Sequence, residues 1–86
     1  MPEISRFFGI VIRMYFREHG IPHFHAEYGE HEAKISIETL SILEGSLPSR
    51  VYGLVVEWAS MHRVEIKDNW ERVSRREPTV KIAPLE

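Results

Sequence analysis

The clearest structural signal lies in residues 22–38, which read Pro22-His-Phe-His-Ala-Glu-Tyr-Gly-Glu-His-Glu-Ala-Lys-Ile-Ser-Ile-Glu38. Apolar and polar side chains alternate on both sides of Gly29-Glu30, a pattern typical of two half-buried strands. A two-residue loop that begins with glycine suits a tight hairpin turn of type II′. We therefore predict a β-hairpin with strands over residues 22–28 and 31–38.

The hairpin turn fixes which residues of the two strands pair. The alternation of apolar and polar side chains in both strands tests this register. Under this register one face is apolar and carries Phe24, Ala26, Ala33, Ile35 and Ile37. The other face is polar, with His25 opposite Lys34 and His23 opposite Ser36. A slip of one residue would move every side chain of a strand to the wrong face. The agreement of both strands therefore supports the predicted register.

Further strands are predicted on both sides of the hairpin. Over residues 10–17, the apolar set Ile10, Ile12, Met14 and Phe16 alternates with Val11, Arg13, Tyr15 and Arg17. Gly20 and Pro22 interrupt strand pairing, so a loop is expected before the hairpin. A looser turn at residues 38–41 leads to a short predicted strand over 42–44, which Gly45 ends.

Residues 48–76 carry a helical pattern. Apolar or aromatic side chains recur at steps of three and four: Val51, Leu54, Val55, Trp58, His62, Ile66, Trp70 and Val73. Pro48 suits the first helical position, and Pro78 ends the helix. One straight helix of this span would be about 43 Å long, too long for so small a sheet. We therefore expect a break near residues 60–62, and the tail over 79–86 can add an edge strand.

These elements predict an α+β fold, in which an antiparallel meander of three to four strands packs on one or two C-terminal helices. The 86 residues are expected to form a single domain over residues 1–86. The absence of cysteine excludes disulfides and thiolate metal sites, and it suits a cytoplasmic location. No apolar run approaches the roughly 20 residues of a membrane helix, so we expect no membrane contact.

Charge is unevenly distributed along the chain. The formal net charge is −2, but residues 18–49 contain six glutamates and one lysine, together with four of the five histidines. The overall balance and the lack of a basic stripe argue against nucleic-acid binding. This acidic, histidine-rich middle segment is the unusual feature of the composition, and a proposed function has to account for it.

The polar face of the predicted sheet is the candidate functional face. It carries Arg13, Tyr15, His23, His25, Glu27, Lys34 and Ser36. Within one strand, His23, His25 and Glu27 project in the same direction, with neighbours about 6.5–7 Å apart. Two imidazoles and a carboxylate are a set that can bind a divalent metal ion. A metal-free binding or proton-transfer surface and a purely structural role remain open, and the charges predict that the face is accessible to solvent.

Five segments of the chain occur together in a characteristic order. They are Ile4-Ser-Arg-Phe-Phe-Gly-Ile-Val-Ile12, Met14-Tyr-Phe16, Pro22-His-Phe-His-Ala-Glu-Tyr-Gly29, Ile35-Ser-Ile-Glu38 and Glu57-Trp-Ala-Ser-Met-His-Arg63. With them the chain resembles the DUF4160 family, a domain of unknown function in short bacterial and archaeal proteins. The resemblance covers nearly the whole chain and implies no catalytic residues. The sequence departs from the family at Leu40-Ser41, where relatives tend to place a turn that contains glycine.

The resemblance also implies a partner. Genes of this family often lie beside genes for DUF2442 proteins, an arrangement like that of toxin–antitoxin pairs. We therefore interpret the chain as a protein-interaction component of a two-gene regulatory or toxin–antitoxin-like module, with a DUF2442-type protein as its partner. The alternative is a metal- or His-assisted hydrolase or nuclease that uses the face of His23, His25 and Glu27. A homodimer is also expected, with Tyr52, Trp58 and Trp70 available for a helical interface.

Overall fold

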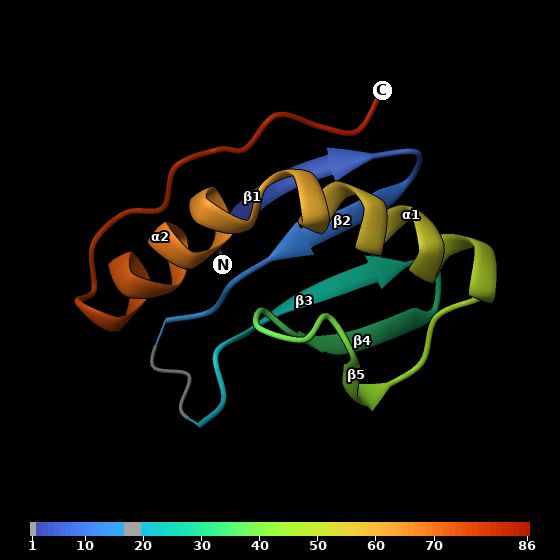
Figure 1. Ribbon diagram of the computed structural model, residues 1–86, viewed down its shortest axis with the longest axis horizontal. Coiled ribbons are helices and arrows are strands. Elements are labelled where there is room, and N and C mark those ends of the chain that lie inside the picture. Colours follow the sequence, from blue (N-terminus) through green and yellow to red (C-terminus); the bar gives the residue numbers. More distant parts are fainter. Residues whose placement is uncertain (1, 17–19) are drawn as a thin grey trace.

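The computed structural model describes residues 2–16 and 20–86, and it forms one antiparallel sheet covered by two helices. The elements are β1 (Glu3–Phe7), β2 (Ile10–Arg13), β3 (His23–Tyr28), β4 (His31–Ser36), β5 (Ile42–Gly45), α1 (Ser49–Met61) and α2 (Arg63–Ser74). The sheet order is β1-β2-β3-β4-β5, and both helices lie over the same face (Figure 1). The predicted α+β class is confirmed, although five strands are present instead of three or four.

The central hairpin forms in the predicted register. In β3 and β4, Phe24 pairs with Ile35 and His25 with Lys34. Gly29 in the turn has a φ of +57°, a conformation that glycine adopts at little cost. The apolar side chains of this hairpin are buried beneath the helices, as the alternation predicted.

The N-terminal strands differ from the prediction. β2 ends at Arg13 instead of continuing to residue 17, and Phe16 is exposed; Arg17 lies outside the described residues. β1 was not predicted, although Ile4 and Phe7 are buried. A register shift between Glu3 and Ser5 inserts a bulge into β1. Because a bulge breaks the two-residue period, alternation could not reveal this strand.

The helical segment breaks where the sequence analysis expected it. α1 ends at Met61 and α2 begins at Arg63, because His62 has the non-helical φ of −129°. The His62 Nδ1 atom lies 2.6 Å from an oxygen of Glu65 in the first turn of α2. α1 begins at Ser49, one position later than predicted, because Pro48 is the residue before the helix and not its first residue. In the described chain, neither helix has the length and apolar character needed to cross a membrane.

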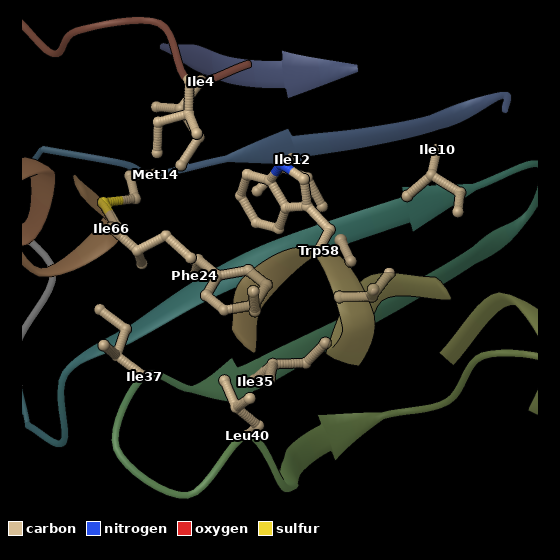
Figure 2. Packing of buried hydrophobic residues seen from close by; sticks show 14 of the residues in the cluster. Ile4, Ile10, Ile12, Met14, Phe24, Ile35, Ile37, Leu40, Trp58 and Ile66 are labelled. Atoms are coloured by element: carbon tan, nitrogen blue, oxygen red, sulfur yellow. The ribbon is translucent and has the colours of Figure 1, made fainter. Parts of the chain in front are cut away.

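Trp58 of α1 lies at the centre of the hydrophobic core. Its side chain is fully buried, and its ring centroid is 5.4 Å from that of Phe7 and 6.0 Å from that of Phe24. Figure 2 shows the indole above the sheet, beside Ile12 and Phe24. The indole Nε1–H donates a hydrogen bond to the Ala83 carbonyl at 2.9 Å. Trp58 therefore joins the sheet, α1 and the C-terminal segment.

The segment after α2, residues 77–86, runs beside β1 (Figure 1). The Ile82 N–H donates to the Ile4 carbonyl at 2.8 Å, and the Ser5 hydroxyl donates to the Ile82 carbonyl at 3.1 Å. Buried Asn69 of α2 donates to the Val80 carbonyl and accepts from the Val80 N–H, both at 2.8 Å. The tail thus covers the edge of β1 as irregular chain, whereas the sequence had suggested an edge strand.

The turn between β4 and β5 contains a leucine in a conformation that favours glycine. Leu40 has a φ of +62°. Its side chain is buried, and its carbonyl accepts a hydrogen bond of 2.7 Å from the Tyr52 hydroxyl. Burial of a leucine side chain offsets the backbone strain at this position.

Candidate functional site

Most of the predicted site residues meet on the sheet face opposite the helices. We call this surface the outer face; it comprises Arg13, Tyr15, His23, His25, Glu27, Glu32, Lys34 and Glu44. Strand alternation places these side chains opposite the buried Phe24 and Ala26. In β3, His25 and Glu27 are therefore on the face away from Phe24 and Ala26, and His23, on the same face by alternation, is buried.

Glu27 is the centre of a polar cluster at the β2 side of the outer face. Its carboxylate accepts hydrogen bonds from Arg13 Nε at 3.1 Å and from the Tyr15 hydroxyl at 3.3 Å. Burial, followed by the negative charges of Glu27 and Glu32, raises the pKa of Tyr15 above its ordinary value. These two hydrogen bonds hold the Glu27 carboxylate on the side of the outer face that is next to β2.

Two imidazoles lie side by side next to this cluster. The His25 ring centroid is 4.5 Å from that of Tyr15 and 5.3 Å from that of His23, both in edge-to-face geometry. The Nδ1 atom of His25 lies 3.3 Å from a carboxylate oxygen of Glu32 in β4. The side chain of His25 retains 12% exposure, so it is the more accessible of the two histidines.

His23 contradicts the expectation that the histidines of this face are accessible to solvent. Its exposure is only 1%, and its Nδ1 atom lies 2.7 Å from the Ile21 carbonyl oxygen. The Trp70 ring of α2 packs on the imidazole with centroids 5.1 Å apart. Burial of His23 therefore follows from a helix that the strand pattern alone does not place there.

Ser36 also differs from its expected position on an open polar surface. It is 3% exposed, and its hydroxyl oxygen accepts a hydrogen bond from the Thr39 N–H at 3.2 Å. This hydrogen bond stabilises the turn after β4.

The structure gives no support to the predicted metal set of His23, His25 and Glu27. Within residues 2–16 and 20–86, no three His, Cys, Asp or Glu side chains are grouped so as to hold a metal ion. Arg13 and Tyr15 bind the carboxylate of Glu27, while it is Glu32 that contacts His25. Metal binding by this set therefore stays a prediction.

Two shallow depressions adjoin on the outer face along β4 and β5. The first, of about 270 Å³, is lined by His25, Glu32, Lys34, Glu44 and Gly45. The second, of about 190 Å³, is lined by Ile21, His23, Lys34, Leu43 and Glu44. Lys34 and Glu44 line both depressions. The ion pair between Lys34 Nζ and the Glu44 carboxylate, at 3.1 Å, lies where the two depressions meet.

A bulge in β5 shapes the second depression. Lys34 pairs with Glu44 and Ile35 pairs with Ile42, so Leu43 has no residue opposite it in β4. Bulges redirect side chains, and here Leu43 lines the same depression as its neighbour Glu44 while remaining 37% exposed. The sequence predicted this strand but carried no signal for its bulge.

A larger groove of about 630 Å³ lies beside α2. It is lined by Pro22, Ile37, Glu38, Arg63, Lys67, Trp70 and Glu71. Arg63 donates to the carbonyl oxygens of Ile37 and Glu38 at 3.4 and 3.1 Å, which ties α2 to the turn after β4. Trp70 belongs to this groove and also packs on His23, so it connects the groove with the outer face. The helical spacing of Arg63, Lys67 and Trp70 is the signal that could have revealed the groove.

Comparison with protein families identifies the chain. A model described as "Domain of unknown function (DUF4160)" matches residues 9–71. The chain belongs to the DUF4160 family. The DUF4160 region includes β2 to β5, α1 and most of α2, and therefore the whole outer face, whereas β1 and the tail lie outside it. No curated protein and no solved structure matches the chain.

The raised pKa of Tyr15 predicts how the Glu27 cluster responds to alkaline pH. Tyr15 should ionise above the ordinary value of 10.0 in the folded protein. Because the unfolded chain releases this proton first, the contribution to stability is complete below pH 10 and is lost as pH rises through the folded-state pKa. Tyrosinate absorbance of the wild type, compared with Tyr15→Phe, measures the pKa.

Glu27→Gln is the matched variant for this titration, because it removes the negative charge but keeps a hydrogen-bond acceptor. It should move the pKa of Tyr15 back toward 10.0. A Tyr15 transition at or below the ordinary value in the wild type would contradict the described cluster.

Proposed function

We propose that the protein is a protein-interaction component of a two-gene module and that it binds its partner protein through the outer face. The observation that carries this proposal is the pair of adjoining depressions along β4 and β5. Ile21 and Leu43 line one of them and are 58% and 37% exposed. Exposed aliphatic side chains grouped beside fixed charges are typical of a surface that a partner covers.

On the outer face, the size of the two depressions favours recognition of a partner over small-molecule catalysis. At about 270 and 190 Å³, the two depressions are smaller than the roughly 300–1,000 Å³ of most small-molecule sites. Lys34 and Glu44, which line both depressions, form an ion pair. This pairing restrains the two side chains before a partner arrives, which lowers the conformational entropy lost on binding.

The position of β5 supports binding on the face instead of at the sheet edge. β5 is the last strand of the sheet, and a sheet edge invites pairing with a strand of another chain. However, β5 has only four residues and contains the bulge at Leu43. Short strands and bulges are features that hinder edge pairing. The partner is therefore proposed to contact the outer face. The homodimer expected from sequence remains a prediction, but Trp58 is not available for its interface because the side chain is fully buried in the core.

A binding experiment with one matched pair of variants tests the proposed function. The probe is a DUF2442-type protein, co-expressed with the chain and analysed by size exclusion with light scattering. We expect a stable complex that Leu43→Lys abolishes, because the lysine places a charge in the apolar depression. Val64→Lys makes the same change at an 83% exposed position of α2 and should leave the complex intact.

The outcomes of this experiment are distinct. Circular dichroism must show that both lysine variants retain the fold. A complex that survives Leu43→Lys, or the absence of any complex with the DUF2442-type protein, would contradict the proposal. Light scattering of the chain alone at high concentration tests the homodimer, since a monomer has a mass of 10.1 kDa.

A His-assisted hydrolase or nuclease is the second candidate. The contact between His25 and Glu32 favours it, because a carboxylate at one ring nitrogen orients an imidazole for proton transfer. Cleavage of RNA by the purified protein, with and without divalent metal ions, tests this candidate. Activity that disappears in His25→Ala but persists in Val64→Lys would replace the binding proposal with an enzymatic one.

A further inference from the structure

We infer that the outer face recognises an extended segment of the partner in which an apolar side chain and a lysine or arginine stand two residues apart. This inference rests on the proposed function above and specifies the chemistry of the partner. It follows from the different linings of the two depressions and from the two residues, Lys34 and Glu44, that line both.

The depression beside the β5 bulge selects the apolar side chain. Ile21 and Leu43 provide two exposed aliphatic side chains, and the buried imidazole of His23 lines the same depression. Trp70 packs on His23 and holds the imidazole in place. An aliphatic side chain of the partner would remove both exposed side chains from water, which is the main favourable contribution at the core of an interface.

The neighbouring depression selects a positive charge. Its lining contains two carboxylates, of Glu32 and Glu44, whose side chains are 54% and 73% exposed. The lysine in this lining, Lys34, is 26% exposed and already pairs with Glu44. Negative charge is therefore in excess where a partner would approach. A lysine or arginine complements this charge, whereas a carboxylate would be repelled.

The arrangement of the depressions sets the spacing in the partner segment. Both depressions include Lys34 and Glu44, so they meet across this one ion pair. In an extended chain, residues i and i+2 point the same way and lie about 6.5–7 Å apart. Such a segment can place one side chain in each depression while its intervening residue points to solvent.

Synthetic peptides test this motif directly. The two probes contain Leu-Ser-Lys and the reversed order Lys-Ser-Leu, each in a Gly-Ser background. The matched peptides of each probe replace lysine by glutamate, replace leucine by alanine, or lengthen the spacing by one serine. Affinities come from fluorescence anisotropy at low ionic strength, where exposed charges act most strongly. We expect one of the two probes to bind at least about tenfold more tightly than each of its matched peptides.

Reversing the charge of the two carboxylates distinguishes specific recognition of the peptide from a general loss of structure. Glu32→Lys combined with Glu44→Lys should reverse the preference, so that the glutamate peptide binds more tightly than the lysine peptide of the same order. A variant with a damaged fold would instead lose binding of both peptides. Equal binding of the lysine and glutamate peptides by the wild type in both orders, or no measurable peptide binding, would overturn the inference.

Failure of this inference can be distinguished from failure of the proposed function. If the DUF2442-type protein binds in a Leu43-dependent manner but the peptides show no preference, the outer face is a binding surface with another sequence motif. If the partner complex is insensitive to Leu43→Lys, the proposed function itself is wrong.

Discussion

Replacement of Trp58 by alanine is expected to lower the free energy of unfolding by about 3–5 kcal/mol. The indole is fully buried and packs against Phe7 and Phe24, so its removal leaves a cavity between α1 and the sheet. The variant also loses the hydrogen bond to Ala83 that holds the C-terminal segment. Because domains are typically stable by only about 5–15 kcal/mol, this loss is a large share of the total.

Urea denaturation followed by circular dichroism measures this effect. Trp58→Phe is the matched variant, because it retains an aromatic ring but lacks the Nε1–H donor. It should be destabilised less than Trp58→Ala. An alanine variant within about 1 kcal/mol of the wild type would contradict the central position of Trp58, since buried tryptophans cost more to remove.

Gly45→Ala is expected to detach β5 from β4 and to abolish partner binding. Gly45 has a φ of +80°, and an added Cβ would lie 2.1 Å from the Glu32 carbonyl oxygen. The left-handed conformation alone costs about 1–2 kcal/mol for a residue with a Cβ. The overlap with backbone adds to this cost, because neither strand can yield without breaking its pairing. Gly45 also lines the first depression, so the binding surface is lost with the strand.

Hydrogen exchange of the Ser46 amide reports on this change, because its N–H donates to the Glu32 carbonyl at 3.1 Å. Exchange should accelerate in Gly45→Ala. Gly53→Ala is the control: this glycine lies in α1, its added Cβ meets no atom within 4 Å, and alanine favours helix by up to about 1 kcal/mol. Unchanged Ser46 protection in Gly45→Ala would show that β5 tolerates the side chain.

The sequence predicted the elements whose signals are local. The β3–β4 hairpin was predicted in the correct register because two-residue alternation and a glycine-first turn act within one short segment. The break at His62 was predicted from helix length. β1 was missed because its bulge disrupts the alternation, and the early end of β2 was missed because the apolar pattern continues to Phe16, which the fold leaves exposed.

The candidate site was predicted only in part, because some of its features depend on contacts between segments that are distant in the sequence. Alternation placed His25, Glu27 and Lys34 on one face, where the structure also has them. The burial of His23 depends on Trp70, a residue of a distant element, and no strand pattern contains that information. The apolar depression depends on the Leu43 bulge, which only the pairing with β4 reveals.

The seating of the tail on β1 has a consequence for synthesis of the chain on the ribosome. Ser5 and Ile82, which are joined by a hydrogen bond, are 77 positions apart. At about 5–20 residues per second, translation takes roughly 4–15 s to cover that separation. A hairpin forms within about 1–10 μs, so β1 and β2 can pair while most of the protein is still unmade. During those seconds the outer edge of β1 is uncovered on the nascent chain, with the charged pair of Arg6 and Glu3 beside it to discourage contacts with neighbouring nascent chains.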